Sequence, residues 1–211
     1  MLEIKNVNVE FKSQKVLSNL NLLIEEGCIL GLLGKNGAGK TTLFESLYQS
    51  VKFSGNINWK NKRLKREVIS YLETENYFYP YMTGEEYLAY FISEKEVNVA
   101  EITEKFNLPL KKYVQYYSSG MKKKLALIGI LMLDKPINIL DEPFNGVDFE
   151  GVHILYDVIR QLKSENKIVI ISSHIIETLF HTCDKIAVLE NGSIHKIYEK
   201  KDFSELSTLK F

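Results

Sequence analysis

A run of glycines that ends in a lysine carries the strongest chemical signal in this chain. Residues 34–41 read Gly-Lys-Asn-Gly-Ala-Gly-Lys-Thr, which fits the pattern G-x-x-x-x-G-K-[ST] of a phosphate-binding loop. Glycines let successive backbone N–H groups curl around an anion, and the start of a following helix adds unpaired donors and a positive dipole end. In such a loop, Lys40 would sit on the β/γ-phosphates and the Thr41 hydroxyl on Mg²⁺.

The segments on either side of the loop support this prediction. Residues 28–33 form an apolar run of strand length, and residues 43–48 have the pattern of an amphipathic helix. The order is therefore strand, glycine loop and helix. Because the helix must begin where the glycines end, this context favours a phosphate-binding loop over a plain glycine-rich turn.

Two acids follow another apolar segment further along the chain. Asp141 and Glu142 come directly after residues 137–140. Paired acids at a strand end are solvated by default. In a protein with an upstream phosphate-binding loop, however, the first acid is the usual second Mg²⁺ anchor, and the next acid can polarise the attacking water. The upstream loop favours this functional interpretation.

Two weaker signals point to the same chemistry. His174 follows the apolar run 168–171, and a histidine at a strand exit beside a phosphate site can hydrogen-bond the γ-phosphate, although a lone histidine is more often structural. Ser118, Ser119 and Gly120 precede an apolar helical segment and form a second anion-ready helix start. Serine caps are common, so this second signal is weak by itself.

Composition sets limits on the class of protein. The chain has 211 residues, enough for one large core, and Lys plus Arg equals Asp plus Glu at 27 each, so no global field draws it to nucleic acid or anionic lipid. The start lacks an apolar core of signal-peptide length, and the longest apolar run, 125–133, is too short to cross a bilayer. We therefore expect a soluble, cytoplasmic protein. Cys28 and Cys183 have no metal-ligand spacing and are expected to be reduced core residues.

Periodicity and capping signals predict the elements that position these groups. Alternation predicts antiparallel strands at 2–11 and 16–24 and short strands at 55–59 and 68–72, the latter two separated by a solvated basic turn, 60–66. Thr83 and Glu86 form a capping box for a helix from 84 to 91 or 92, and residues 98–116 suggest a short helix and a loop. Further predictions are a helix at 121–133, a strand at 137–140, a helix capped by Asp148 and reaching 162, a buried parallel strand at 168–171, and a hairpin of 186–189 with 193–198.

Two sets of aromatic residues allow two interpretations each. Phe11 would lie near the mouth of the loop, where it either stacks on adenine or packs in the core. Residues 77–81, Tyr-Phe-Tyr-Pro-Tyr, either hold the following helix against the core or line a docking groove. We expect a mixture of the two for 77–81.

The order of these motifs resembles the ATP-binding subunit of ABC transporters over nearly the whole chain. The matching segments are 34–41 as Walker A, 117–121 as the signature, 137–142 as Walker B, 144–148 as the D-loop region and His174 as the switch histidine. The resemblance implies an α/β fold: a P-loop NTPase (RecA-like) parallel sheet core with an N-terminal antiparallel β subdomain and a small α-helical subdomain. It also implies a single ATP-binding domain, 1–211, with the helical insertion at about 76–133.

The resemblance also assigns roles to residues. Glu142 and His174 would be catalytic, Glu142 as base or water-orienting group and His174 as a partner of the γ-phosphate, while Thr41, Asp141 and Thr74 would lie at Mg²⁺. The residues implied to bind ATP are Phe11, Gly34, Asn36, Gly37, Ala38, Gly39, Lys40, Thr41, Thr42, Ser118, Ser119 and Gly120. Ser118 and Gly120 would reach the ATP bound on the opposite subunit, so two chains would close head to tail on two nucleotides.

Three positions depart from the family pattern. Thr74 stands where the Q-loop glutamine belongs, and its shorter side chain cannot reach as far toward Mg²⁺ or its water. Ser119 replaces a glycine and Met121 a glutamine of the commonest signature. The form Tyr-Ser-x-Gly-Met is similar to that of bacterial exporter-type subunits.

The resemblance implies partners as well. The chain would be a homodimer or heterodimer of ATPase subunits, peripheral at the inner face of the cell membrane, that drives a permease on a separate chain, in the direction of export, without nucleic acid. One alternative is an ATP-dependent clamp on ribosomes or DNA, although such relatives usually carry two cassettes, a coiled coil or a basic arm. Another alternative, motivated by Thr74, is a regulatory subunit with weakened turnover.

Overall fold

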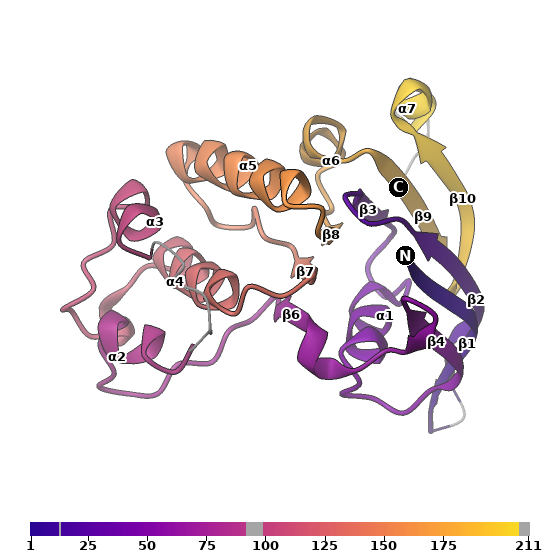
Figure 1. Cartoon of the computed structure of the whole chain (residues 1–211), viewed down its shortest axis with the longest axis horizontal. Helices are drawn as coiled ribbons and strands as arrows, with labels where there is room; N and C mark the ends of the chain where they lie inside the picture. The colour runs from indigo at the N-terminus through magenta and orange to yellow at the C-terminus, as the bar shows by residue number, and fades with distance from the viewer. Residues whose placement is uncertain (13, 92–98, 207–211) are drawn as a thin grey trace.

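Two β-sheets organise the computed structural model, which describes residues 1–12, 14–91 and 99–206 (Figure 1). The antiparallel sheet has the strand order β2-β1-β4-β5. Its strands are β1 (Leu2–Phe11), β2 (Gln14–Ile24), β4 (Ser54–Trp59) and β5 (Lys62–Arg63). The two strands predicted at the N-terminal end are confirmed, and β2 begins two residues earlier than predicted because its first residues pair with the end of β1.

The other sheet is mostly parallel and has the order β10-β9-β3-β8-β7-β6. Its strands are β3 (Ile29–Leu33), β6 (Ile69–Leu72), β7 (Ile137–Asp141), β8 (Ile168–Ser172), β9 (Lys185–Glu190) and β10 (Ser193–Glu199). Only β10 runs antiparallel to its neighbour, as the predicted closing hairpin requires. The strand order is not the chain order, so helices must connect the parallel strands across the two faces.

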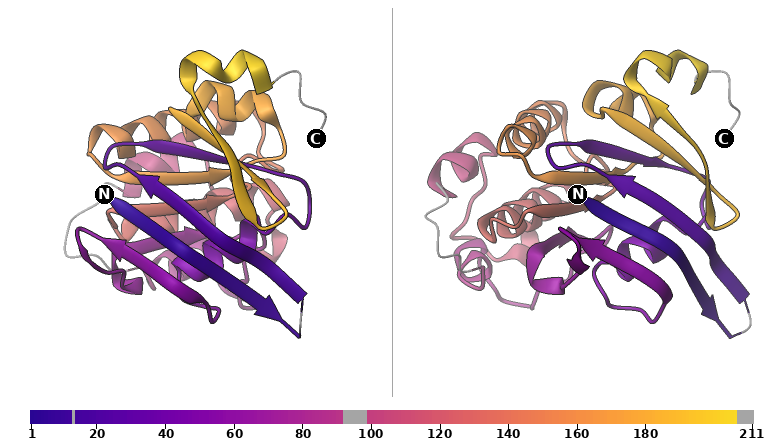
Figure 2. Two further views of the ribbon diagram at one scale, coloured as in Figure 1. Left: turned by 90° about the vertical axis from the view of Figure 1, so that its right-hand side faces the viewer. Right: turned by 45° about the vertical axis from the view of Figure 1, so that its right-hand side comes forward.

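Both faces of the parallel sheet are covered. Along β8, Ile168 and Ile170 pack into one hydrophobic cluster and Val169 and Ile171 into the other, because successive side chains of a strand point to opposite faces. The first cluster contains the inner face of the antiparallel sheet and α1 (Lys40–Leu47), which lies between the two sheets (Figures 1 and 2). This confirms the predicted strand buried on both faces.

The opposite face packs against helices. α4 (Ser119–Met132), α5 (Phe149–Ser164) and α6 (Ile176–Thr182) contribute buried leucines and isoleucines to that cluster, and α7 (Phe203–Leu206) closes it. Asp148 caps α5 as predicted, with its side chain accepting a hydrogen bond from the Gly151 N–H. Cys28 and Cys183 are buried and free, as expected.

A mainly helical segment between β6 and β7 contains α2 (Gly84–Leu88), α3 (Val99–Lys105) and α4. Figure 1 shows α2 and α3 at the end of the molecule opposite the antiparallel sheet. The Thr83–Glu86 capping box is present. The predicted end of this helix at 91 or 92 is wrong, because α2 ends at Leu88 with Ala89 as its C-cap, and the chain continues through a tighter turn to Phe91. Ile92 lies outside the described residues.

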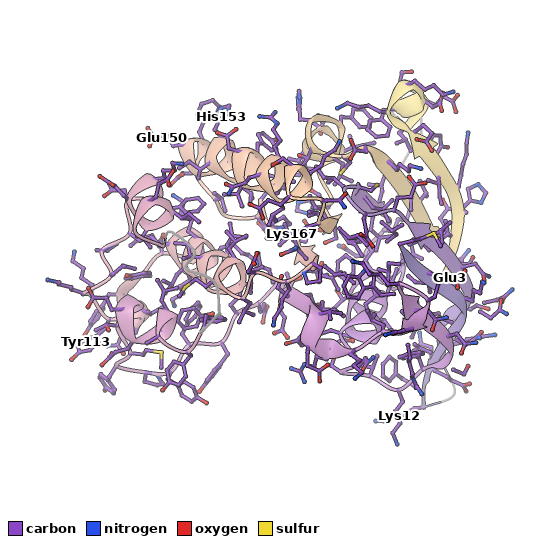
Figure 3. All side chains as sticks on the ribbon, viewed as in Figure 1. Glu3, Lys12, Tyr113, Glu150, His153 and Lys167 are labelled. Carbon is purple, nitrogen blue, oxygen red and sulfur yellow. The ribbon has the colours of Figure 1, made fainter. Side chains whose placement is uncertain are left out.

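Short 3₁₀ turns and surface charges complete the description. The turns are η1 (Arg66–Val68), η2 (Val114–Tyr116) and η3 (Lys200–Asp202). The basic turn 60–66 is exposed apart from Leu64, as predicted, although it also contains β5 and the start of η1. Charged side chains of both signs, such as Lys12 and Glu150, extend from distant parts of the surface (Figure 3). Among the described residues, no helix combines the length and the apolar character needed to cross a bilayer.

Candidate functional site

The carboxyl ends of four neighbouring parallel strands meet at one edge of the sheet. The loop 34–39 follows β3, Thr74 follows β6, Asp141 ends β7 and Ser172 ends β8, and the register pairs Asp141 directly with Ser172. A pocket of about 440 Å³ opens here. Its lining residues are Val16, Asn36, Gly37, Gly39, Lys40, Thr41, Thr42, Thr74, Asp141 and Glu142. The topology thus brings together the glycine loop and the acids predicted from distant parts of the sequence.

The glycines of the loop adopt backbone conformations that other residues disfavour. Gly37 and Gly39 have φ angles of 80° and 106°, and Gly39 is the residue directly before α1. A Cβ atom at Gly39 would lie 2.9 Å from Leu17 Cδ2, so a side chain has neither the conformation nor the space it needs there. The loop therefore leads directly into the N-terminus of α1 at the pocket, and a helix N-terminus after a glycine loop is the usual arrangement of an anion cradle.

Lys40 turns its side chain back onto the loop. Its ammonium donates hydrogen bonds to the carbonyl oxygens of Gly34 at 2.6 Å and Lys35 at 3.2 Å. The side chain is 9% exposed, so these carbonyls compensate for much of its lost hydration. This position at the loop allows the ammonium to exchange a carbonyl partner for a phosphate oxygen.

Asp141 is the buried centre of a hydrogen-bond network. One carboxylate oxygen accepts a bond of 3.0 Å from the Thr41 hydroxyl, and the other accepts a bond from the Ser172 hydroxyl. Ser172 in turn accepts a bond of 2.9 Å from the Glu142 backbone N–H. Ser172 therefore fixes the carboxylate and the following peptide relative to each other, a role that we did not predict although the residue stands at the end of a predicted strand.

Glu142 and His174 form a pair at the rim of the pocket. Glu142 has a φ of 49°, a left-handed conformation that is uncommon for a residue with a side chain and tends to occur at functional sites. Its Oε2 lies 2.8 Å from His174 Nδ1 and 3.3 Å from the His174 backbone nitrogen. The predicted acid and histidine therefore meet, although the sequence separates them by 32 residues.

Negative charge accumulates beside the cradle. Partial burial, together with the nearby Glu73 and Asp141 carboxylates, raises the pKa of Glu45. Burial, reinforced by Asp141, also raises the pKa of Tyr71. This arrangement places the anion cradle next to a group of carboxylates, so a cation between them would relieve the repulsion.

Several predicted site residues lie outside this pocket. Ser118 and Ser119 are exposed at the start of α4, where the Ser118 hydroxyl accepts the Met121 N–H at 3.2 Å. Gly120 is buried there, and a Cβ atom on it would lie 2.3 Å from the Gly146 carbonyl oxygen. Phe11, at the end of β1, is 45% exposed and is also absent from the pocket wall. Within one chain, the serine-capped helix start does not complete the phosphate pocket.

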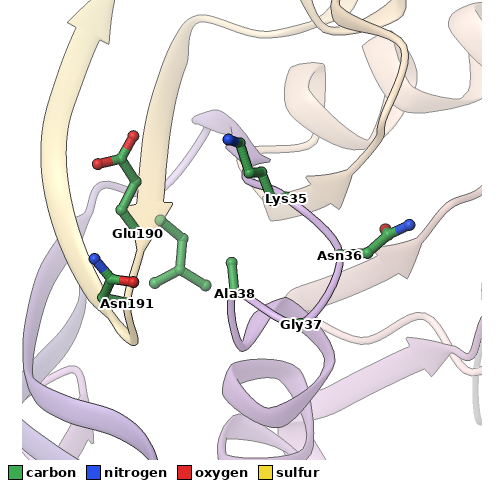
Figure 4. A pocket seen from close by; sticks show the side chains of 7 residues that line it. Lys35, Asn36, Gly37, Ala38, Glu190 and Asn191 are labelled. Atoms are coloured by element: carbon green, nitrogen blue, oxygen red, sulfur yellow. The ribbon is translucent and has the colours of Figure 1, made fainter. Parts of the chain in front are cut away.

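Two features around the glycine loop could not be predicted from the sequence: one residue of the pocket wall and a second pocket. Val16 reaches the pocket from β2; its proximity to the predicted loop follows only from the sheet packing. A second pocket of about 370 Å³ lies between the loop and the β9–β10 hairpin, where Lys35 and Ala38 face Glu190 and Asn191 (Figure 4). Gly34 and Ala38, both predicted to bind ATP, lie in this neighbourhood: Ala38 lines the second pocket, and a Cβ atom on Gly34 would approach the Leu189 carbonyl oxygen at 2.6 Å.

The fold and the pocket together define a class of protein. A glycine loop between a parallel strand and a helix, with a buried aspartate on a nearby parallel strand, is the arrangement of a P-loop nucleotide hydrolase. Comparison with known proteins narrows this class. The family model described as "ABC transporter" matches residues 17–145.

Individual relatives agree with the family match. The uncharacterized ABC transporter ATP-binding protein YhcH of Bacillus subtilis (strain 168) is 31% identical over 96% of this chain and 71% of its own length. A solved structure described as an ATP binding subunit of an ABC transporter is 26% identical, with a TM-score of 0.89 over 98% of this chain and 93% of that chain. The chain belongs to the ABC transporter family. As a member of this family it is an ATP-binding subunit and an ATPase.

Two further solved structures share the fold. CbiO1 from Clostridium perfringens, described as part of the ABC transporter complex cbiONQ, has a TM-score of 0.78 at 24% identity, covering 98% of this chain and 91% of its own. The cassette MJ0796, solved as a dimer in a post-hydrolysis state with ADP and Pi, has a TM-score of 0.80 at 19% identity, covering 95% of this chain and 99% of its own. At these identities the likeness shows the fold alone.

Proposed function

We propose that this ATP-binding subunit dimerises on ATP and drives a separate membrane permease in the direction of export. The observation that carries the proposal is the division of the site. One chain places its glycine loop, Asp141 and Glu142 in one pocket and leaves the serine-capped start of α4 outside it. A second subunit is the simplest source of the missing wall.

Within the pocket, each residue has a role that its position supports. The loop N–H groups and Lys40 hold the phosphates, and Thr42 and Asn36 extend the lining. Glu142 orients the attacking water. His174 holds the Glu142 carboxylate in place, and it hydrogen-bonds the γ-phosphate when ATP is bound. Catalysis by these groups is positioning and charge neutralisation rather than covalent chemistry.

Mg²⁺ fits this pocket with few protein ligands. Thr41 and Asp141 offer a hydroxyl and a carboxylate 3.0 Å apart, and Thr74 lines the same pocket from the end of β6. Across the described residues, no group of three or more His, Cys, Asp or Glu side chains could hold a metal by itself. Mg²⁺ needs no such group, since it commonly uses one or two carboxylates with waters and substrate phosphates. When bound, the ion supplies neutralisation of the phosphate charge.

A dimer completes the site if the two chains pack head to tail. Ser118, Ser119 and Gly120 of one subunit would then face the triphosphate on the other, and Phe11 would stack on the adenine. The dimeric solved structure of the MJ0796 cassette supports this arrangement. The same arrangement is available to two copies of this chain or to this chain and a similar one.

The permease would dock on the helical segment, which we propose to be a subdomain inserted at about 76–133 in a single ATP-binding domain, 1–211. Exposed tyrosines gather there, and four of them form two edge-to-face pairs with ring centroids 5.2 Å and 6.2 Å apart. The exposed tyrosines described in this segment are Tyr77, Tyr79, Tyr81, Tyr90, Tyr113 and Tyr116. Phe78, by contrast, packs against Tyr87 and the hydrophobic core, as one of the two interpretations of the aromatic run expects, and the exposed tyrosines are the residues that we propose for docking. Tyr113 marks the far end of the molecule in Figure 3, and aromatic residues of this kind anchor protein interfaces.

Export is the proposed direction because the signature reads Tyr-Ser-Ser-Gly-Met, similar to exporter-type subunits. CbiO1, which has the same fold, is part of a transporter complex, and this supports a separate permease. Association with such a permease would place the chain peripherally at the inner face of the cell membrane.

Detergent purification of the tagged chain from its native membranes tests the partner. We expect an integral membrane protein to co-purify, and the double variant Tyr79→Ser/Tyr116→Ser to lose it. Phe149→Ser is the matched control, because Phe149 is 79% exposed but lies on α5. An eluate of folded, ATP-binding chain without any membrane protein would contradict the proposal.

In vesicles with ATP on the cassette side, cargo movement toward that side would contradict export.

A further inference from the structure

Two consecutive lysines near the start of α4 are buried, which is unusual for this residue type. Lys123 and Lys124 are both 7% exposed, whereas Lys122 beside them is half-buried. Burying an ammonium is unfavourable unless hydrogen bonds or an opposite charge compensate. Their partners therefore show what the structure gains from placing them there.

Lys123 binds the main chain that follows β6. Its ammonium donates a bond of 2.9 Å to the Glu73 carbonyl oxygen and one of 2.7 Å to the Thr74 carbonyl oxygen. These carbonyls are 50 and 49 residues away in the sequence. Burial lowers the pKa of Lys123, while the Asp141 and Glu142 carboxylates act in the opposite direction. Lys123 thus connects α4 to a segment that lines the phosphate pocket.

Lys124 holds the same helix to a second segment. Its ammonium lies 2.7 Å from Asp148 Oδ2, and Asp148 caps α5. Gly120 supports the same packing. Because it has no side chain, α4 can lie close to the Gly146 carbonyl, where a Cβ atom would not fit. Lys124 fixes α4 to the start of α5, and Lys123 makes a separate hydrogen-bonded connection between α4 and the segment at Thr74.

We propose that Lys123 is a positioning residue that couples the two halves of the ATP site. On the proposed function, Thr74 faces the ATP of its own subunit, and Ser118 to Gly120 face the ATP of the partner. A hydrogen-bonded link from Thr74 to the helix that begins at Ser119 joins these two surfaces within one chain. Because Lys123 binds main-chain oxygens, the link does not depend on which side chain stands at position 74.

The link should be required for the dimer and not for binding of ATP by one chain. In Lys123→Met, a side chain of similar length removes the donors without leaving a buried charge. Tested in the Glu142→Gln background, this variant should keep the ATP dissociation constant within about twofold and weaken ATP-induced dimerisation by about tenfold or more, the scale of one hydrogen bond to a charged group. Equilibrium ultracentrifugation with ATP measures the dimer, and fluorescent-ATP titration measures binding.

Two variants make the result specific. Lys122→Met removes a neighbouring ammonium and should leave both quantities unchanged, and Lys123→Arg, which retains donors, should recover most of the dimerisation. Hydrogen–deuterium exchange should show faster exchange of the amides at residues 73–76 in Lys123→Met, a change that a loss of overall stability would spread over the whole chain. If Lys123→Met does not fold, Lys123→Leu, which also lacks a donor, replaces it, and the same loss of dimerisation is expected.

The outcomes separate this inference from the proposed function. If Glu142→Gln alone does not dimerise on ATP, the proposed function fails and the coupling with it. If Glu142→Gln dimerises and Lys123→Met dimerises equally well in that background, the coupling role is overturned while the proposed function stands. Equal loss of dimerisation in Lys123→Met and Lys122→Met, or no recovery in a folded Lys123→Arg, would also overturn the coupling role.

Discussion

The ammonium of Lys40 already has two partners before any phosphate arrives, because it donates to the carbonyls of Gly34 and Lys35. These bonds keep a nearly buried charge in place beside the cradle, and a phosphate oxygen can replace one of them with a charge-assisted bond. Preorganisation of this kind lowers the cost of binding, since the side chain has little freedom left to lose.

Removing the Lys40 ammonium should weaken the hold of the site on the ATP phosphates. We expect Lys40→Ala to lower the ATPase rate by about a hundredfold or more, the scale seen when a principal charge-stabilising donor is lost. Lys35→Ala is the matched control, because Lys35 is exposed and contributes only its backbone carbonyl to Lys40. Steady-state phosphate release measures both variants, and unchanged turnover in Lys40→Ala would contradict the site assignment.

A substitution at Thr74 tests whether this residue slows ATP hydrolysis. It lines the pocket, but its side chain is shorter than the glutamine that the family pattern places there. If reach limits the positioning of water, Thr74→Gln should raise kcat by about tenfold and change the KM for ATP little. Thr74→Val, with similar shape and no hydroxyl, should not raise kcat. An unchanged kcat in a folded Thr74→Gln would show that position 74 does not limit hydrolysis, which would remove the motive for a regulatory role.

Among the elements, α5 shows how one cap links separate parts of the chain. Asp148 accepts the Gly151 N–H at 2.7 Å and the Lys124 ammonium at 2.7 Å. The Lys124 bond and the Gly151 N–H lower the pKa of Asp148. The carboxylate is 65% exposed but the Lys124 side chain only 8%, so the lysine is the partner that depends on the pair.

The variant Asp148→Asn separates the helix-capping role of Asp148 from its ion pair with Lys124. Asparagine caps helices as well as aspartate does, so α5 should keep its start while Lys124 loses its counter-charge. We expect a loss of about 1 to 2 kcal/mol in the free energy of unfolding at pH 7, measured by urea denaturation. Asp148→Ala, which removes the cap as well, should lose more.

The pH dependence of this difference follows from the lowered pKa. A carboxylate with a depressed pKa in the folded state contributes stability that is present above its unfolded pKa and is lost as the pH falls through the folded value. The gap between the wild-type protein and Asp148→Asn should therefore narrow below about pH 4. A gap that is constant down to pH 2 would show that the charge of Asp148 does not cause it.

Signals confined to a few consecutive residues predicted local elements and helix caps well. The glycine loop, the Thr83–Glu86 capping box and the Asp148 cap each depend on contacts within one turn, and the structure confirms all three. The buried parallel strand at 168–171 was visible because both of its faces are apolar. The end of α2 was predicted wrongly, since an apolar helical pattern continues past Leu88, whereas the α-helical bonds give way to the tighter i→i−3 bonds of Tyr90 and Phe91.

Features that depend on packing could not be predicted from the sequence. Nothing in three consecutive lysines distinguishes the two that are buried, because their partners at 73–74 and 148 are brought close only by the fold. The same holds for Ser172, whose bond to Asp141 requires β7 and β8 to be neighbours in register. The left-handed backbone of Glu142 likewise follows from its surroundings and not from the residue type.

At the scale of the whole molecule, the two sheets and the helical segment leave the ATP pocket open on one side. The Walker A loop, Asp141 and Glu142 line that pocket, and the start of α4 lies elsewhere on the same chain. With no net charge, two copies do not repel each other through a global field. On the proposed function, association of the two chains therefore depends on the ATP bound between them, and hydrolysis of this ATP separates the chains.

Glu142→Gln tests whether ATP joins two chains. The amide keeps the size of the side chain and removes the group that orients water, so ATP should bind and remain intact, and the dimer should accumulate. Size-exclusion chromatography with ATP should show a shift from monomer to dimer, reversed when EDTA or an excess of ADP is added. Glu104→Gln, an equal change of charge at an exposed position on α3, is the control and should stay monomeric after turnover. A Glu142→Gln variant that is loaded with ATP and monomeric at every concentration tested would contradict the shared site, and the role proposed for Ser118 and Gly120 would fall with it.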